Sequence, residues 1–389
     1  MNPNILRPDV QEFITSFQGD SSRLAFSGSP FPSITVQELL VQINGREKAK
    51  VKLPTWFNSK AIYFPPKLNL EQTSSEITAN YKASLVSGRS IADLTGGFGI
   101  DTAAFSETFD QVTHFEQNDE LSKIAAHNFA ALKKNNIECI TGDSLLKIKS
   151  ESYDVIYVDP ARRHDRKGKV FQLADCAPSI PTHLDYLLDR CKSLIIKTSP
   201  MLDISLGISE LKHVHEIHVI AVSNEVKELI WLIRKESVNS IKMVTRNFVK
   251  NEVQEFDFQM NESATPFYDL PKQFLYEPNA AILKSGAFQL ISQRKGVEKL
   301  HLHSHLYTSS SLQDFPGRRF EILEVIPYSK NEMKTKIAKT KANVTVRNFP
   351  ENVLQLRKKW KISEGGTIYL FFTINKNDER IVLVCTKVE

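Results

Sequence analysis

The sequence predicts an α/β fold, and three features of residues 90–234 indicate it. Short apolar segments alternate there with segments whose apolar residues have helical spacing, which is typical of a parallel sheet covered by helices. A glycine-rich loop joins the first apolar segment to the first helical one. Only SNEVKE separates the last two apolar segments, too short for a parallel crossover, so we expect an antiparallel hairpin at the end of the sheet. The predicted strands are 90–95, 111–116, 137–141, 153–158, 193–198, 215–222 and 229–234.

The composition is that of an ordinary soluble globular protein. The 389 residues are 41% hydrophobic and 24% charged, and the length suggests two to three domains. No apolar run reaches the ~18 residues of a membrane-spanning helix, and the N-terminus has no apolar signal core, so we expect a cytoplasmic protein. The four cysteines form no CxxC pair, which argues against a zinc ribbon and for reduced thiols.

Helices are expected before the sheet. Residues 8–17 and 34–43 have helical spacing, and the following stretch up to residue 67 is too rich in proline and aromatic residues for a regular helix. The run Thr73-Ser74-Ser75-Glu76 then fits a capping box, with the hydroxyl of Thr73 as N-cap and Glu76 at N3. We therefore predict an N-terminal helical region at 1–67 and the sheet domain at 68–237.

Two smaller modules are expected after the sheet. Residues 238–319 offer alternating segments typical of strands, and 320–389 contain, in order, a strand, a basic helix, a strand, a helix and two strands. Between Lys330 and Lys361, ten lysines and arginines accompany two glutamates, a net charge of +8 in a chain whose total is +5. This basic end indicates an anionic partner, although a solvated lysine-rich surface has the same composition.

Acidic residues follow four successive predicted strands. Asp93, Glu116, Asp143 and Asp159 stand at or just after the strand ends. Because ligands of open α/β sheets bind beyond the carboxyl ends of the strands, these side chains should gather on one rim. A ligand with an amino group, a ribose diol and an adenine amine offers a donor to each of the first three, and S-adenosylmethionine is such a ligand. The alternative is that each acid caps the helix that follows it.

The loop after the first strand carries Gly96, Gly97 and Gly99. Glycines let the backbone turn tightly and approach a ligand. Gly97 and Gly99 fit the first two positions of the dinucleotide fingerprint, but Thr102 occupies the third, which weakens a nicotinamide interpretation.

These segments resemble a known family. DLTGGFG, FEQN, TGD and VDPARR look like the successive motifs of class I S-adenosylmethionine-dependent methyltransferases, whose sheet also ends in an antiparallel hairpin. The segment IYFPPKLNLEQTSSEITANYKASL and the basic C-terminal module are similar to bacterial RNA-methyltransferase-like proteins with a THUMP-like domain, which are related to the guanine-N2 methyltransferases of RNA caps. The resemblance implies a Rossmann-like seven-stranded methyltransferase sheet, a ferredoxin-like module at 238–319 and a THUMP-like RNA-binding domain at 320–389.

The resemblance also implies roles for individual residues. Asp93 and the glycine loop would hold the methionine end of S-adenosylmethionine, Glu116 would accept from the ribose hydroxyls, and Asp143 from the adenine amine. Residues 71–76 would close over the cofactor from the N-terminal side. The full set of implied cofactor-binding residues is Asp93, Thr95, Gly96, Gly97, Phe98, Gly99, Glu116, Gln117, Asp143 and Ser144.

The resemblance further implies a methyl-acceptor pocket at Asp159 and Pro160, and we expect Arg162 as the third catalytic residue. Enzymes that methylate amines of nucleic acids usually have Asp/Asn-Pro-Pro and then an aromatic residue. Here Ala161 and Arg162 follow instead, which leaves Arg162 to stack on a base or bind phosphate. Methylation of pyrimidine carbon 5 needs a cysteine nucleophile, and the strand that ends in KTSP lacks one, so we favour a nitrogen acceptor.

RNA is the expected partner, bound by cations in two regions. Arg163, Arg166 and Lys167 form a basic loop beside the expected acceptor pocket. In the C-terminal module the expected phosphate contacts are Lys334, Lys336, Lys339, Lys341, Arg357, Lys358 and Lys359. The sequence thus predicts an S-adenosylmethionine-dependent RNA methyltransferase. Two alternatives stay open, namely a non-catalytic RNA-binding or assembly factor with a vestigial cofactor fold, and a small-molecule methyltransferase.

We expect no metal site and no membrane partner. His301, His303 and His305 share one face of a possible strand, but no carboxylate or cysteine accompanies them, so we interpret them as a surface histidine face. The aromatic residues Trp56, Phe57, Tyr63 and Phe64 suit either base stacking or a core, and a core is the more usual role.

Overall fold

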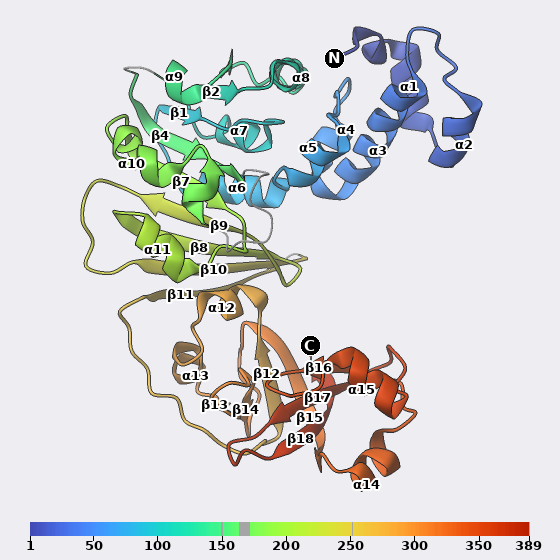
Figure 1. The fold of residues 1–389 in the computed structure, drawn as a ribbon, viewed down its shortest axis with the longest axis vertical. Coiled ribbons are helices and arrows are strands. Elements are labelled where there is room, and N and C mark those ends of the chain that lie inside the picture. Colours follow the sequence, from blue (N-terminus) through green and yellow to red (C-terminus); the bar gives the residue numbers. More distant parts are fainter. Residues whose placement is uncertain (149–150, 163–171, 251, 389) are drawn as a thin grey trace. The chain divides into compact units, whose positions relative to one another are not determined.

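The structure is a computed structural model, and it describes residues 1–148, 151–162, 172–250 and 252–388 (Figure 1). The chain divides into two compact units. One comprises Met1–His215 and Ile230–Val238, and the other comprises Glu216–Leu229 and Asn239–Glu389. Within the described residues, no helix has the length and apolar character needed to cross a membrane.

The chain begins with a series of short helices. Their bounds are η1 (Pro3–Leu6), α1 (Pro8–Ser16), α2 (Ser21–Ser27), α3 (Val36–Lys52), α4 (Pro54–Asn58), α5 (Lys67–Gln72) and α6 (Glu76–Ser84). α1 and α3 confirm the two helices predicted before residue 44. α4 corrects the expectation of a wholly irregular segment before residue 67, because Pro54 stands at the first helical position, where its missing N–H costs no hydrogen bond.

The start of α6 differs from the predicted capping box. Ser75, not Thr73, is the N-cap. Glu76 does not reach back to the N-cap but accepts from backbone N–H groups of α4. Ser74 turns inward and donates to Asp101 at 2.8 Å. With three hydroxyl residues in a row, the one nearest the helix caps it and its neighbour is free to bind elsewhere.

A nine-stranded sheet follows, in the order β11-β10-β8-β9-β7-β4-β1-β2-β3. The bounds are β1 (Ser90–Asp93), β2 (Gln111–Glu116), β3 (Ile137–Thr141), β4 (Tyr153–Val158), β7 (Cys191–Thr198), β8 (Val214–Val222), β9 (Glu225–Ile233), β10 (Lys242–Val249) and β11 (Glu252–Gln259). The seven predicted strands are confirmed. β3, β2, β1, β4 and β7 run parallel, so their carboxyl ends share one edge of the sheet.

The prediction that the β8–β9 hairpin ends the sheet is wrong. Ser223 and Asn224 both have positive φ, as the two-residue turn of a hairpin requires. Beyond the hairpin, β10 pairs in parallel with β8, and β11 pairs antiparallel with β10. An edge strand leaves a row of backbone groups unpaired, and β10 satisfies those of β8. The first strands of the segment predicted as a separate module thus belong to this sheet.

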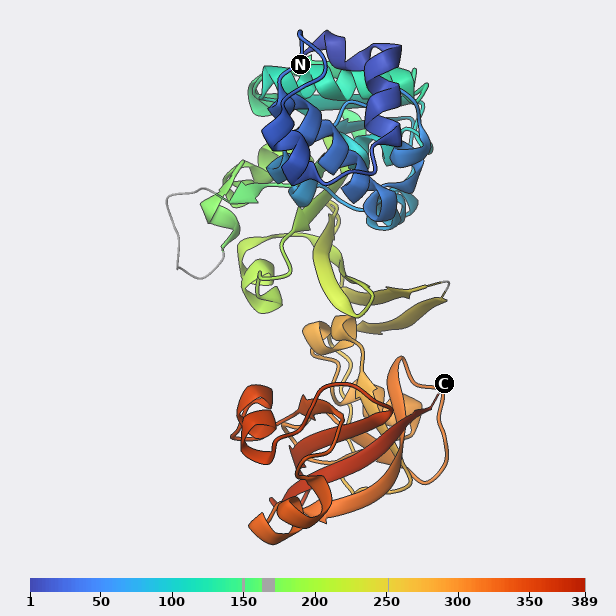
Figure 2. The ribbon, with the colours of Figure 1, turned by 90° about the vertical axis from the view of Figure 1, so that its right-hand side faces the viewer.

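Helices and short elements connect the strands. They are α7 (Ile100–Phe105), α8 (Asp119–Ala131), α9 (Ser144–Lys147), β5 (Ala161–Arg162), η3 (Leu173–Asp175), β6 (Cys176–Ala177), α10 (Ile180–Leu188) and α11 (Ile204–Glu210). α8 buries Leu121, Ile124 and Ala125, whose spacing of three and one residues places them on one helix face. Asn128 on α8 is also buried and bonds both the N–H and the C=O of Tyr63, which fixes the N-terminal region against this helix (Figure 2).

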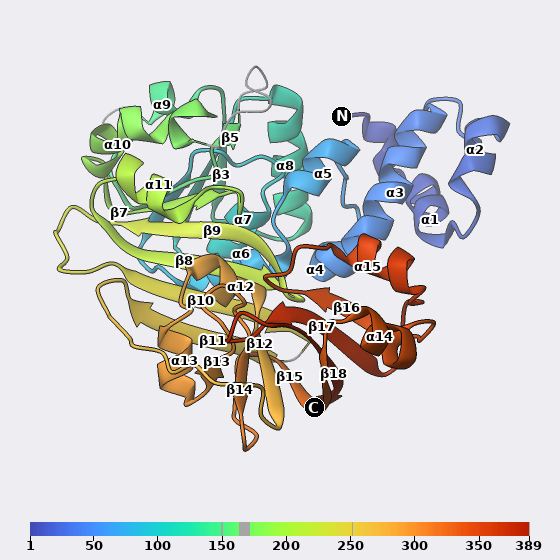
Figure 3. The same ribbon diagram turned by 60° about the horizontal axis from the view of Figure 1, so that its bottom comes forward.

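A second sheet has seven strands in the order β13-β14-β12-β15-β18-β17-β16 (Figure 3). Its elements are β12 (Phe274–Pro278), α12 (Ala280–Ser285), α13 (Leu290–Lys295), β13 (Glu298–Lys299), β14 (Tyr307–Ser309), β15 (Gly317–Pro327), α14 (Lys330–Glu332), η4 (Met333–Ile337), β16 (Asn343–Val346), α15 (Val353–Trp360), β17 (Ile368–Ile374) and β18 (Arg380–Val388). The order predicted beyond residue 320 is confirmed. β15 pairs with both β12 and β18, so the predicted boundary at 319/320 falls within one strand.

Candidate functional site

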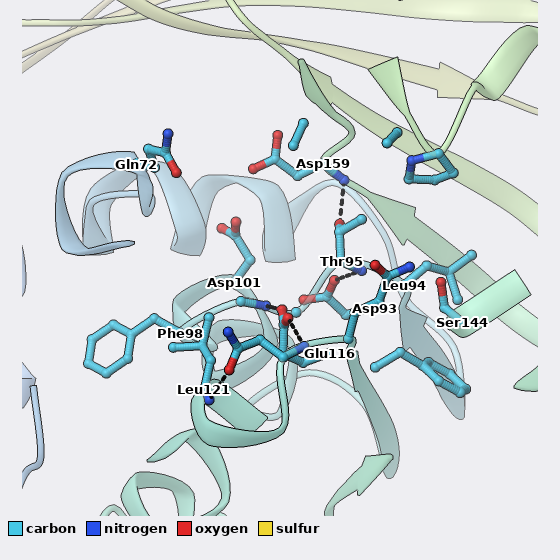
Figure 4. Close-up of a pocket in the computed structure, with 18 of the residues that line it drawn as sticks. Gln72, Asp93, Leu94, Thr95, Phe98, Asp101, Glu116, Leu121, Ser144 and Asp159 are labelled. Carbon is cyan, nitrogen blue, oxygen red and sulfur yellow. Dashed lines mark hydrogen bonds between the residues drawn. The ribbon is translucent and has the colours of Figure 1, made fainter. Parts of the chain in front are cut away.

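The four acids predicted at the strand ends, Asp93, Glu116, Asp143 and Asp159, all line one cavity of about 530 Å³. Figure 4 shows three of them, Asp93, Glu116 and Asp159, around this cavity. They converge because β1 pairs in parallel with β2 on one side and with β4 on the other, and β3 continues beyond β2. The cavity therefore opens where an open α/β sheet binds its ligands.

Asp93 is the most buried of these acids, with 1% of its surface exposed. Its Oδ1 accepts from the Thr95 N–H at 3.1 Å, and its Oδ2 accepts from the Thr102 hydroxyl at 2.6 Å. Burial, opposed by the Thr102 hydrogen bond and assisted by the charges of Asp101 and Asp159, raises the pKa of Asp93 to about 7. A cationic group placed beside it would favour the ionised form.

Glu116 and Asp143 bind backbone groups in different ways. Glu116 accepts from the Gly97 N–H at 2.9 Å and from the Asn118 N–H at 2.7 Å, so it holds the glycine loop against the end of β2. Asp143 is the N-cap of α9 and accepts from the Leu145 N–H at 2.9 Å. The capping alternative is therefore correct for Asp143, which lines the cavity as well.

The three loop glycines differ in what surrounds them. A Cβ on Gly96 would lie 2.2 Å from the His114 ring, and one on Gly99 would lie 2.3 Å from the Phe129 ring. Gly97 has a φ of +55°, yet its nearest neighbour would be the Thr95 carbonyl at 3.8 Å. Gly97 therefore borders open space in the cavity, whereas Gly96 and Gly99 allow close packing of the loop.

Asp159 is held at two points. Its N–H donates to the Thr95 hydroxyl at 2.7 Å, and its Oδ2 accepts from Lys197 Nζ at 2.5 Å. Lys197 lies at the carboxyl end of β7, in the segment KTSP. Sequence reasoning missed this lysine, although the same rule that located the acids, applied to the fifth strand, would have pointed to it.

The N-terminal region supplies one wall of the cavity. Residues 72–74 line it, within the segment 71–76 expected to close over the cofactor. Beneath them Asp101 accepts from Ser74 and from the Tyr157 hydroxyl, and Lys82 Nζ lies 3.1 Å from its Oδ1. Burial alone would raise the pKa of Asp101, but the charges of Lys82 and Lys197 hold it below its ordinary value. The buried Lys82–Asp101 pair was not predicted.

The opposite wall comes from the segment around β5, β6 and α10. Ala161, Ala177, Pro178 and His183 line the cavity there, and β5 pairs antiparallel with β6. Only the backbone of Arg162 is described. The predicted basic loop of Arg163, Arg166 and Lys167 lies outside the described residues.

Most of the remaining predicted cofactor residues line the cavity, namely Thr95, Gly96, Gly97, Phe98, Gln117 and Ser144. Gly99 of that set does not line it, and neither does Pro160, which was predicted for the acceptor pocket. Gly99 instead has a φ of +93° at the N-cap of α7, where the chain turns from the loop into the helix. Gly99 is therefore required for this turn and for the close packing of the loop against Phe129.

The predicted C-terminal cations fall into two groups. Three of them form ion pairs, namely Lys336 with Glu324 and Glu332, Arg357 with Glu364, and Lys359 with Glu351. The exposed lysines for which the described residues show no ion pair are Lys334, Lys339, Lys341 and Lys358. Some of the residues predicted to bind phosphate are thus already paired with carboxylates of the protein.

The aromatic and histidine side chains considered as candidate binding residues lie outside the cavity. Trp56, Tyr63 and Phe64 are at most 7% exposed, which confirms the core interpretation for these three. Phe57 is half-buried instead, with the Arg46 guanidinium 4.1 Å from the centre of its ring. His305 stacks on Phe288 with the ring centroids 3.6 Å apart. Among the described residues, no group of three histidine, cysteine or acidic side chains is placed to hold a metal ion.

The glycine loop yields a stability prediction. Gly99→Ala should lower the free energy of unfolding by about 2–4 kcal/mol, because a positive φ and an overlap with Phe129 act together. Gly97→Ala should cost about 1 kcal/mol, since only its φ is unfavourable. Urea denaturation of both variants measures the difference, and equal losses would contradict the assignment of Gly97 to open space.

Comparisons with known proteins cover the whole chain. Residues 274–316 match a ferredoxin-like domain family, and residues 317–387 match a THUMP domain-like family. The chain is 33% identical to a provisionally identified methyltransferase from Porphyromonas gingivalis W83, whose crystal structure matches with a TM-score of 0.89 over 99% of this chain and 98% of that one. It is 23% identical over 265 residues to an uncharacterized S-adenosylmethionine-dependent methyltransferase of Mycobacterium tuberculosis, present in strains CDC 1551 and H37Rv, over 68% of this chain and 71% of that protein.

The full-length match and the two C-terminal domain matches agree with the observed layout. They confirm an α/β methyltransferase-like sheet that follows N-terminal helices and precedes ferredoxin-like and THUMP-like domains. The chain belongs to the family of S-adenosylmethionine-dependent methyltransferases that carry these two C-terminal domains.

Proposed function

We propose that this chain transfers a methyl group from S-adenosylmethionine to a base nitrogen of RNA. The observation that carries the proposal is the convergence of Asp93, Glu116 and Asp143 on one cavity at the strand ends. These carboxylates supply acceptors for the three groups of donors that the cofactor presents. The open space beside Gly97 fits the same ligand, because a backbone without a Cβ lets it approach closely.

The cofactor would lie along the strand ends. Asp93 would accept from its ammonium, Glu116 from the ribose hydroxyls and Asp143 from the adenine amine. The other cavity-lining residues of the predicted set would complete its surroundings, and residues 72–74 would exclude water from the N-terminal side. The methyl group to be transferred comes from the sulfonium of the bound cofactor.

Asp159 would hold the acceptor. A carboxylate at this position accepts a hydrogen bond from an exocyclic amine and keeps its nitrogen close to the methyl group. Chemistry at carbon 5 would need a thiolate nucleophile, and no cysteine lines the cavity in the described part of the chain. The buried Cys176 and the thiol of Cys191, at the opposite end of β7, are not placed for that role.

RNA as the substrate is supported by the THUMP-like domain and by its charge. The exposed lysines of residues 330–361 suit an anionic polymer, since each phosphate contact releases counterions. A metabolite would need no such surface. The family's domain layout therefore favours RNA over a small-molecule acceptor.

One observation favours a second candidate, a non-catalytic RNA-binding factor. Ala161 stands where amine methyltransferases have a second proline, and no aromatic residue follows it. Labelled methyl transfer from the cofactor to total RNA decides between the two. We expect transfer by the wild type and loss of at least ~100-fold in Asp159→Ala, with the affinity for S-adenosylhomocysteine retained. Cofactor binding without any transfer would support the binding factor.

The affinity for S-adenosylhomocysteine should fall with pH below about 7. Because burial raises the pKa of Asp93 to about 7, its carboxyl is protonated at lower pH and no longer attracts the ammonium. The dissociation constant should rise about tenfold per pH unit below that value. Asp93→Asn should bind more weakly at pH 7.5 and should lack this dependence. Titration calorimetry from pH 5.5 to 7.5 measures both proteins, and parallel profiles would contradict the role of Asp93.

RNA affinity should depend on the exposed C-terminal lysines. One variant replaces four of them by glutamine, namely Lys334, Lys339, Lys341 and Lys358. Its salt dependence should become shallower by about one unit for each lost phosphate contact, while S-adenosylhomocysteine binding stays the same. A matched control replaces four exposed lysines of unit 1 for which the described residues likewise show no ion pair, namely Lys50, Lys60, Lys133 and Lys212. Fluorescence anisotropy with labelled total RNA measures both variants, and equal slopes would contradict delivery by the THUMP-like domain.

A further inference from the structure

Lys197 is the one described cation in direct contact with the acid at the proposed acceptor position. Its Nζ lies 2.5 Å from Asp159 Oδ2, and only 12% of its side chain is exposed. The contact follows from the sheet, because β4 and β7 are parallel neighbours with Val158 opposite Ile196, so the next residues of both strands reach the same edge. A lysine is rarely buried to this extent unless it is paired.

We propose that Lys197 is a positioning residue for methyl transfer, which holds one oxygen of Asp159 and leaves the other directed to the acceptor amine. This inference rests on the proposed function and deepens it. The backbone of Asp159 is fixed by Thr95, and its Oδ2 by Lys197. Within the described residues Oδ1 receives no hydrogen bond from the protein, so it is the oxygen available to a substrate donor.

The charges around the cavity support this role. Asp101 and Asp159 both act on Asp93, and Lys197 acts on Asp101 as well as on Asp159. Without Lys197, the described residues leave one cation, Lys82, in contact with this group of three carboxylates. Asp159 would then lose the contact that fixes its Oδ2, and its carboxylate would no longer be held toward the acceptor amine.

The same two strands provide a matched control. Lys192 lies near the start of β7, and its Nζ is 2.6 Å from the carboxylate of Asp154 on β4. This pair also joins β4 to β7, but at the edge opposite the cavity, and neither residue lines it. Both lysines thus link the same two strands through a carboxylate. The side chain of Lys192 is 82% exposed and that of Lys197 is 12% exposed, and of the two bound carboxylates Asp159 lines the cavity and Asp154 does not.

The test compares Lys197→Met, Lys197→Gln, Lys197→Arg and Lys192→Met in the full chain. Each variant is measured for thermal unfolding, for S-adenosylhomocysteine affinity and for labelled methyl transfer to total RNA. Both neutral Lys197 variants should lose roughly 10- to 100-fold in transfer rate, since a small misplacement of a positioning group has this effect. Their S-adenosylhomocysteine affinity should stay within about threefold of the wild type. Lys197→Arg should retain more activity than either, and Lys192→Met should match the wild type.

A double variant distinguishes positioning from a general structural effect. If Lys197 acts through Asp159, Lys197→Gln combined with Asp159→Asn should transfer no more slowly than Asp159→Asn alone. Additive losses, or neutral Lys197 variants with wild-type rates, would overturn the inference while the proposed function stands. A wild-type protein that binds S-adenosylhomocysteine but methylates no RNA would overturn the proposed function and this inference together.

Discussion

The balance of charge at the carboxyl ends of the strands is the constraint on which this site depends. Asp93, Asp101 and Asp159 line one cavity where the parallel strands end, and burial there disfavours the ionised forms of Asp93 and Asp101. Lys82 offsets the charge of Asp101, and Lys197 that of Asp159. Asp93 has hydrogen bonds but no direct cationic partner among the described residues, which makes it the carboxylate that a cationic ligand would complete.

This charge balance couples the N-terminal helices to the sheet. Lys82 comes from α6 and Asp101 from α7, so one buried ion pair joins the two regions. Ser74 binds the same carboxylate, and the residues around it form a wall of the cavity. The N-terminal region is thus part of the site, and its packing and the ionisation of the cavity depend on each other. Breaking such a pair leaves an uncompensated buried charge, which is strongly destabilising.

The sheet and the rim of acids could be predicted from the sequence. The sheet follows from the alternation of strand-like and helix-like apolar patterns, and the rim follows from the position of the acids at the strand ends. The strand ends that carry Asp93, Glu116 and Asp159 could be located from the alternation of apolar segments alone. Lys82 could not be predicted in the same way, since a single lysine on a helix does not reveal its partner. Lys197 stands at a strand end, where the same rule applies, but its pairing with Asp159 depends on which strands are neighbours in the sheet. The contacts of the acids with the cofactor remain predictions.

The order of the strands and the edges of the sheet were harder to predict from the sequence. Residues 242–259 alternate in the manner of any half-exposed strand pair, and only the unpaired edge of β8 decides that they extend the first sheet. For the same reason the predicted boundary at 319/320 fell within β15. This strand pairs with β12 of the ferredoxin-like domain and with β18 of the THUMP-like domain. Local pattern indicates where strands are, whereas long-range pairing decides to which sheet they belong.

A crystal structure of the protein with S-adenosylhomocysteine tests the central claim most directly. The account predicts the ligand in the cavity at the carboxyl ends of β1 to β4. Its ammonium should lie within hydrogen-bond distance of Asp93, its ribose hydroxyls should lie at Glu116, and its adenine amine should lie at Asp143. A ligand bound elsewhere, or bound in this cavity with its ammonium away from Asp93, would contradict the account.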